Sequence, residues 1–271
     1  MSISNNLSMT VVNLKKKVYI SIYLFLLLFM VTNLYSYQSS YNGTKYFFNW
    51  VLYSLNQSIT SNFVIPILFT LTISYMLSTN DNRLIIYRMK NRTQIFLYNV
   101  WVIIYNDLIF IAGILGTIIL LSISSQNKIQ FNWDEKSIKS FSMLFNGFSP
   151  NNAQPIIQII MLIVFMFLFL LFLGLLTQTI NLLFKNKATP TFINIFLIIL
   201  QGKVSSIPGF NTNFIKYFPI SHFLLYSDQT INFTETSNFN IIVFYNIIYW
   251  IICIFIITFI LEKIYKHKQF N

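Results

Sequence analysis

The chain has 271 residues, of which 55% are hydrophobic, 18% are aromatic and only 9% are charged. Soluble proteins keep about a quarter of their residues charged, so this composition excludes a water-soluble fold and predicts a polytopic membrane protein. The net charge of +11 does not indicate a nucleic-acid partner, because a membrane protein is usually basic through its cytoplasmic loops.

The first half of the chain predicts three transmembrane helices. An apolar run at 18–36 follows the basic residues 15–17 and lacks a signal-peptidase site, so we expect an uncleaved first span with its N-terminus inside. The polar, aromatic stretch after it predicts an external loop with a short interfacial helix around 47–55. The second and third spans are expected at 62–78 and 95–123.

The stretch between the second and third spans, residues 81–93, is the most basic part of the chain's interior. Its apolar and basic residues alternate as in a short amphipathic helix. Two interpretations stay open. The charges are ordinary positive-inside charges on a cytoplasmic loop, or they belong to a helix that docks on a cytoplasmic partner. On the docking interpretation the contact residues are Arg83, Ile86, Tyr87, Arg88, Lys90 and Arg92.

The second half predicts three more spans, at 155–184, 190–207 and 241–261. The fifth has an apolar core of only about 12 residues, which is about 18 Å of helix and too short for a hydrocarbon core of about 30 Å. Either this helix continues past Lys203, whose side chain then reaches the interface, or it stops partway. In the second case residues 208–225 fold back as a re-entrant or interfacial segment before the sixth span.

The distribution of basic residues predicts six spans with both termini in the cytoplasm, in a single domain covering 1–271. Of the 18 Lys and Arg residues, 12 lie in the segments that this topology places inside and six in those that it places outside. The inside set is Lys15, Lys16, Lys17, Arg83, Arg88, Lys90, Arg92, Lys185, Lys187, Lys263, Lys266 and Lys268, and the outside set is Lys45, Lys128, Lys136, Lys139, Lys203 and Lys216.

Motifs for enzyme chemistry are missing from the chain. It has no G-x-x-x-x-G-K-[ST] loop for ATP, no H-E-x-x-H, no G-x-S-x-G and no C-x-x-C. Cys253 is the single cysteine, and His222 and His267 are far apart in the sequence. We therefore expect this chain not to be an enzyme and not to hold a metal.

Three polar residues inside the predicted spans are candidates for a translocation path. Asp107 is the one carboxylate within a span, and an acid there is a candidate proton or cation site. The alternative, which we favour, places it at the inner edge of the hydrocarbon, paired with Arg88 or Arg92. Gln178 and Asn181 share a helix face and either line a path or bond a neighbouring helix.

Two strings within this architecture resemble the permease subunit of an ABC-2-type ABC transporter, as found in small Firmicute permeases. They are IIYRMKNRTQIFLYNV at 85–100 and YFPISHF at 217–223. The first lies where that family has a basic coupling helix and the second where it places external re-entrant helices before the last span. The resemblance implies that Arg83, Tyr87, Arg88, Lys90 and Arg92 contact a cytoplasmic ABC ATPase.

The same resemblance implies the function and the partners. The chain would be the membrane-spanning subunit of an ATP-driven exporter in the bacterial cytoplasmic membrane, acting on an antimicrobial peptide, lipid or drug. Export of an antimicrobial peptide would give self-immunity. Its partners would be the ATPase, a second permease copy or related permease, and the bilayer. This chain would need no cofactor, since ATP and Mg belong to the ATPase. The alternatives are an ion-coupled secondary carrier that uses Asp107 and a non-transporting sensor or assembly component.

Overall fold

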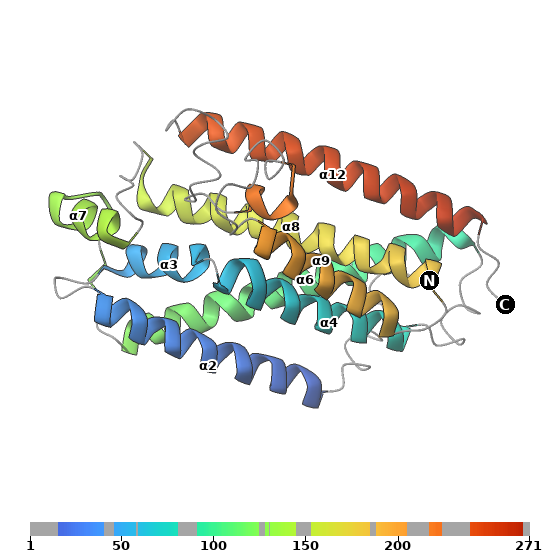
Figure 1. Cartoon of the computed structure of the whole chain (residues 1–271), viewed down its shortest axis with the longest axis horizontal. Helices are drawn as coiled ribbons and strands as arrows, with labels where there is room; N and C mark the ends of the chain where they lie inside the picture. Colours follow the sequence, from blue (N-terminus) through green and yellow to red (C-terminus); the bar gives the residue numbers. More distant parts are fainter. Residues whose placement is uncertain are drawn as a thin grey trace.

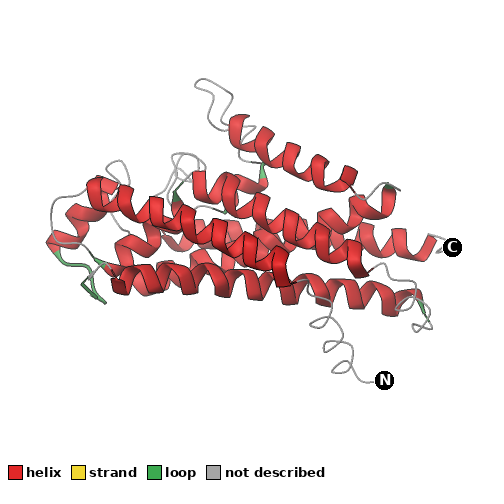
Figure 2. Ribbon diagram, turned by 90° about the horizontal axis from the view of Figure 1, so that it is seen from below, coloured by secondary structure: helices red, strands yellow, loops and turns green. Residues whose placement is uncertain are grey.

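The computed structural model describes residues 16–40, 46–57, 59–80, 91–124, 128–129, 131–144, 153–184, 188–204, 217–223 and 239–267. Within these ranges every regular element is a helix, and one isolated bridge joins Tyr46 to Lys128. The longer helices lie side by side along one common axis (Figure 2). The prediction of an all-α fold is confirmed for this part of the chain.

Five stretches of helix are long and apolar enough to cross a membrane, and they indicate a multi-pass membrane protein. They coincide with five of the six predicted spans, and several extend beyond the predicted limits. They are α2 (Lys16–Ser40), the π-helical turn η1 (Thr60–Val64) with α4 (Ile65–Asn80), α6 (Arg92–Ser124), α8 (Pro155–Leu183) and α12 (Phe239–His267).

The remaining predicted span is the helix α9 (Ala188–Val204), which has 17 residues. At 1.5 Å per residue it is about 25 Å long, less than a hydrocarbon core of about 30 Å. It reaches Val204, with Lys203 exposed in its last turn, and the region 205–216, where the two predicted alternatives differ, lies outside the described residues. Near this end Gly202 packs so closely on Phe63 of η1 that an added Cβ would lie 2.4 Å from the ring.

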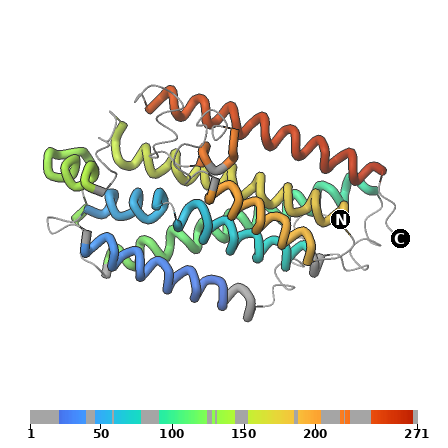
Figure 3. Tube along the Cα trace, viewed as in Figure 1, coloured from blue at the N-terminus to red at the C-terminus, as the bar shows by residue number. Residues whose placement is uncertain are grey.

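The predicted interfacial helix exists as α3 (Phe47–Asn56), but its predicted position is wrong. Eight of its ten residues are buried, and it packs against α8, α2 and α6. The Trp50 indole Nε1 donates a hydrogen bond to the carbonyl of Ile118 at 3.3 Å, so its polar atom does not need interfacial water. In Figure 3, α3, η1 and α4 follow one another along the bundle, and the stretch among them that is long and apolar enough to span a membrane is Thr60–Leu77.

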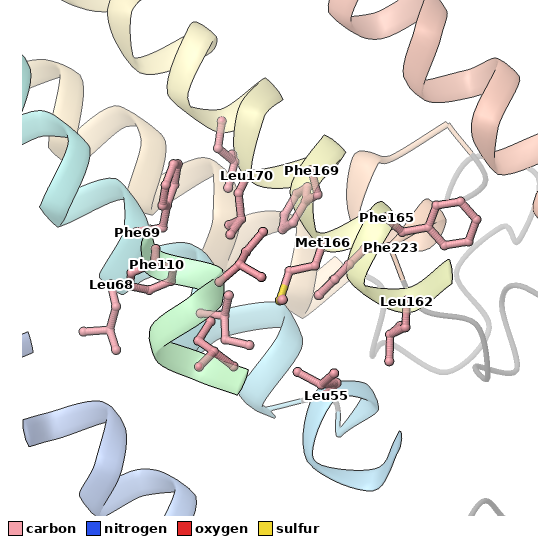
Figure 4. Packing of buried hydrophobic residues seen from close by; sticks show 14 of the residues in the cluster. Leu55, Leu68, Phe69, Phe110, Leu162, Phe165, Met166, Phe169, Leu170 and Phe223 are labelled. Atoms are coloured by element: carbon pink, nitrogen blue, oxygen red, sulfur yellow. The ribbon is translucent and has the colours of Figure 1, made fainter. Parts of the chain in front are cut away.

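The core is centred on α8, which packs against α12, α6, α4, α9 and α3. Close approach to α6 is possible because Gly174 has no side chain, and an added Cβ there would lie 2.4 Å from Cγ2 of Ile103. The apolar cluster in Figure 4 brings Phe69 of α4 against Phe110 of α6, with ring centroids 5.5 Å apart. This packing determines what surrounds the polar residues in the interior.

The two ends of the bundle are formed by different elements. At one end α4 and α12 finish and α6 begins (Figure 1), and the exposed side chains include Arg92, Lys263 and Lys266. We call this the basic end. The opposite end carries the short helix α7 (Glu135–Leu144), whose first turn is capped by Asp134: its carboxylate accepts the Ser137 backbone N–H at 2.7 Å.

Candidate functional site

Asp107 lies in the middle of α6, and its side chain has 0% exposure. It is 15 residues after Arg92 and 17 before Ser124, which places it about 22 Å and about 25 Å from the helix ends. Neither carboxyl oxygen has a hydrogen-bond partner among the described residues. The predicted pairing with Arg92 is therefore wrong, and Arg88, the other predicted partner, lies outside the described residues.

The turns of α6 on either side of Asp107 make apolar contacts. One turn before it, Ile103 is buried against Gly174 of α8. One turn after it, the Phe110 ring lies 5.5 Å from Phe69 of α4 and 6.3 Å from Tyr23 of α2, measured between centroids. The carboxyl group thus belongs to a helix face that is otherwise packed with hydrocarbon.

A first layer of buried polar groups lies between Asp107 and the basic end. The side-chain amides of Asn99 on α6 and Gln178 on α8 both donate to the hydroxyl of Tyr265 on α12, each at 2.5 Å. Next to Gln178, the hydroxyl of Thr177 accepts a hydrogen bond of 2.6 Å from the amide of Asn194 on α9. Four helices are therefore joined here through neutral polar side chains.

A second layer of polar groups lies toward the α7 end, where α3 ends and η1 begins. Gln57 ends α3, and its carbonyl accepts from both the backbone N–H and the hydroxyl of Ser61. The Thr60 hydroxyl donates to the Gln57 side chain at 3.0 Å and accepts from the Asn33 amide of α2 at 2.7 Å. The Gln57 carbonyl is thereby satisfied at the end of α3, as an apolar environment requires.

The segment 217–223, part of the predicted re-entrant region, is inserted between α8 and α12. It contains the 3-10 turn η2 (Pro219–His222). The His222 ring stacks on Tyr249 with centroids 3.6 Å apart, and its Nδ1 lies 2.8 Å from Oδ1 of Asn246. Phe223 stacks on Phe169, which is the central residue of α8. The turn therefore reaches the middle of the bundle.

The other predicted site residues are placed as follows. Gln178 is buried and bonds a neighbouring helix, Asn181 is half-buried on the last turn of α8, and Arg92 is the exposed first residue of α6. The Arg92 guanidinium donates to the backbone carbonyl of Lys266 on α12. The predicted docking residues Arg83, Ile86, Tyr87, Arg88 and Lys90 lie outside the described residues.

Several polar residues of the site were not singled out from the sequence. They are Asn33, Thr60, Asn194, Asn246 and Tyr265. For Asn194 and Asn246 the signal that could have identified them is a polar residue inside an otherwise apolar run.

The arrangement combines one carboxyl group with two flanking layers of amides and hydroxyls. Within the described ranges no cluster of three His, Cys, Asp or Glu side chains has the geometry for a metal ion. The chemistry that the described interior offers is therefore that of one buried carboxyl group, the buried imidazole of His222 and neutral hydrogen-bonding groups. Comparison of the chain with protein-family models, with curated proteins and with solved structures finds no match.

Proposed function

We propose that this chain is the permease subunit of an ATP-driven ABC exporter in the bacterial cytoplasmic membrane. The observation that carries the proposal is the insertion of η2 between α8 and α12. The family that the sequence resembles has re-entrant helices directly before the last span, and here the short α9 is followed by a turn that packs into the bundle interior. Irregular backbone at membrane depth needs such burial in protein, and it is common in transporters.

The arrangement at the basic end supports the docking of an ATPase there. The basic segment 81–91 connects the end of α4 to the start of α6, and Figure 1 has both helix ends at this end of the bundle. Arg92 links the start of α6 to the last turn of α12 through the Lys266 carbonyl. A partner that engaged the segment would therefore act on helices that are joined to one another.

The proposal includes six crossings with α9 as the fifth, both termini in the cytoplasm and a coupling helix between the second and third. A second permease copy, or a related permease, completes the transmembrane unit. The substrate is amphipathic or hydrophobic, such as an antimicrobial peptide, a lipid or a drug, and export of a peptide would give self-immunity. ATP and Mg are bound by the partner.

The test is co-purification with a P-loop ATPase encoded beside this chain, in detergent, comparing the wild type with the double variant Tyr87→Ala/Arg88→Ala. Aromatic and Arg residues dominate interface energetics, so we expect the double variant to lose about 2–4 kcal/mol of binding and to release the ATPase. The spans should still insert, because the other basic residues keep the segment inside.

A matched control is Lys136→Ala, which removes a basic side chain from α7 at the opposite end of the bundle and should leave co-purification intact. Undiminished binding of the ATPase by the double variant would contradict docking through this segment. ATP-independent transport in proteoliposomes, driven by a proton or sodium gradient, would instead support the ion-coupled carrier.

A further inference from the structure

We propose that Asp107 is a reversible proton-binding site in the middle of the helix bundle. The proposal concerns the carboxyl group alone, and it holds whether transport is driven by ATP or by an ion gradient. Its basis is the geometry around α6: complete burial, a position midway along the helix and the lack of a partner for either oxygen among the described residues.

The first step of the argument is the cost of charge. A carboxylate buried without a counter-charge or hydrogen-bond donors is far less stable than the same group as a neutral acid. An acid at membrane depth is correspondingly rare, and it marks ion pathways and proton relays. With Ile103 against Gly174 on one side and Phe110 against Phe69 on the other, the surroundings of Asp107 favour the neutral form.

The second step concerns the ligand. A hard metal cation such as Ca²⁺ takes six or more oxygen ligands, which several side chains must supply together. The neighbouring turns of α6 provide hydrocarbon contacts, and the amide nitrogen of the adjacent Asn106 donates to the carbonyl of Val102 in its own helix. A proton needs only the carboxyl group itself, so the site fits a proton better than a metal ion.

The third step is an inventory of the elements that pack against α6, namely α2, α3, α4, α8 and α12. Their charged side chains and His267 lie at helix ends, and α8 carries no titratable side chain. Tyr23 of α2 contacts the turn of α6 that follows Asp107, where its hydroxyl donates to the Ile109 carbonyl at 3.1 Å, and α6 itself carries Tyr98 and Tyr105. The end groups are Lys16, Lys17, Glu262, Lys263, Lys266 and His267, and the other titratable side chains on these helices include Tyr53, Tyr75, Tyr249 and Cys253.

The experiment is labelling with dicyclohexylcarbodiimide, an apolar carbodiimide that reaches carboxyl groups in membranes. A protonated carboxyl group adds across one C=N bond, its proton passes to the carbodiimide nitrogen, and the adduct rearranges to a stable N-acylurea. We expect mass spectrometry of the full-length chain in liposomes to locate the label on Asp107. The labelling rate should fall as the pH rises, because only the protonated acid reacts.

Two variants control the experiment. Asp107→Asn keeps the size of the side chain and should abolish the label at this position, whereas Glu135→Gln removes an exposed acid on α7 and should leave the label on Asp107 unchanged. Size-exclusion chromatography establishes that both variants are folded. Infrared spectra of the liposomes should contain a C=O band of a protonated acid that shifts in D₂O and is missing from Asp107→Asn.

Two results would overturn the proposal. The first is a folded wild-type protein without label on Asp107 and without the infrared band at any pH. The second is labelling that Na⁺ or Ca²⁺ suppresses at constant pH, which would assign the site to a metal cation. Neither result depends on co-purification with an ATPase, so failure of this proposal and failure of the permease proposal are distinguishable.

Discussion

At the scale of single residues, the carboxyl group of Asp107 is poorly suited to its surroundings. Asp107 is fully buried, and neither of its oxygens accepts a hydrogen bond within the described part of the chain. Residues of this kind are usually kept for function at a cost in stability. The effect of replacing Asp107 on the stability of the fold can therefore be measured separately from its effect on activity.

We expect Asp107→Leu to stabilise the folded protein. Leucine branches at the same carbon as aspartate and removes two unsatisfied oxygens, and an unpaired buried polar group costs about 1–3 kcal/mol. The measurement is the thermal unfolding midpoint of the purified chain in detergent. Asp107→Asn is the matched control, because it keeps the size and the polarity and should gain less. A midpoint for Asp107→Leu below that of Asp107→Asn would indicate partners for the carboxyl group.

A second residue-scale feature is the contact between α6 and α8 at Gly174. An added Cβ would lie 2.4 Å from Cγ2 of Ile103, a branched side chain that cannot swing away at its tip. We expect Gly174→Ala to destabilise the fold by about 1–3 kcal/mol, as overpacking of a core does. Thermal unfolding in detergent measures it.

Gly116 provides the control for that substitution. It lies in the same long helix as Ile103, but an added Cβ would meet nothing within 4 Å. Gly116→Ala should be neutral or stabilising by up to about 1 kcal/mol through helix propensity. Equal losses for the two variants would mean that the close approach of α6 and α8 does not explain the effect.

At the scale of helices, the polar layer at the basic end joins elements that are far apart in sequence. Tyr265 accepts from Asn99 and Gln178, and its ring contacts Phe96 edge-on at 5.8 Å between centroids. The start of α6, the end of α8 and the end of α12 are thereby held by one side chain. In the proposed permease this junction lies next to the docking segment.

We expect Tyr265→Phe to loosen this junction while the ring packing is kept. Two amides lose their common acceptor, which costs about 1–3 kcal/mol for each amide that stays buried and unsatisfied. The measurement is again the thermal unfolding midpoint. Tyr245→Phe removes the same hydroxyl from a half-exposed position of α12 and should change little. If both variants lowered the midpoint equally, the hydrogen bonds that Tyr265 accepts from Asn99 and Gln178 would not explain the loss of stability.

At the scale of the whole molecule, the open question is how often the chain crosses the bilayer. Five described stretches of helix have the length of a span, and α9 is shorter. The insertion of η2 beside Phe169 offers a way for the chain to complete the fifth passage, because buried irregular backbone can follow a short helix within a membrane.

We therefore expect the chain to cross the membrane an even number of times. Accessibility tags at Ser2 and Asn271 should both report the cytoplasm, and a tag at Gln126 should report the outside, since the basic residues favour the cytoplasmic face for both ends. Spheroplasts and inverted vesicles provide the two orientations for the assay. Tags at Ser2 and Asn271 on opposite faces would mean an odd number of crossings, with α9 as a helix that does not span.

Much of the helical architecture could be predicted from the sequence. The apolar runs around Leu26, Phe69, Ile118, Phe169 and Ile257 all lie in helices, because hydrocarbon surroundings leave the backbone no other way to satisfy its hydrogen bonds. The position of the basic segment between α4 and α6 and the shortness of α9 followed from charge and length alone. These are local properties that need no knowledge of which helices touch.

The environment of each polar residue was decided only by the tertiary structure. Asp107 was expected at the hydrocarbon edge because aromatic residues precede it, yet its side chain is fully buried midway along α6. The indole N–H of the buried Trp50 is satisfied by the carbonyl of Ile118, 68 residues later. Tyr265 meets Asn99 across 166 positions, and His222 meets Asn246 only when η2 enters the bundle. The sequence determined which segments are apolar enough to become helices. Burial and hydrogen bonding depend on the side chains that distant segments bring, so only packing could decide them.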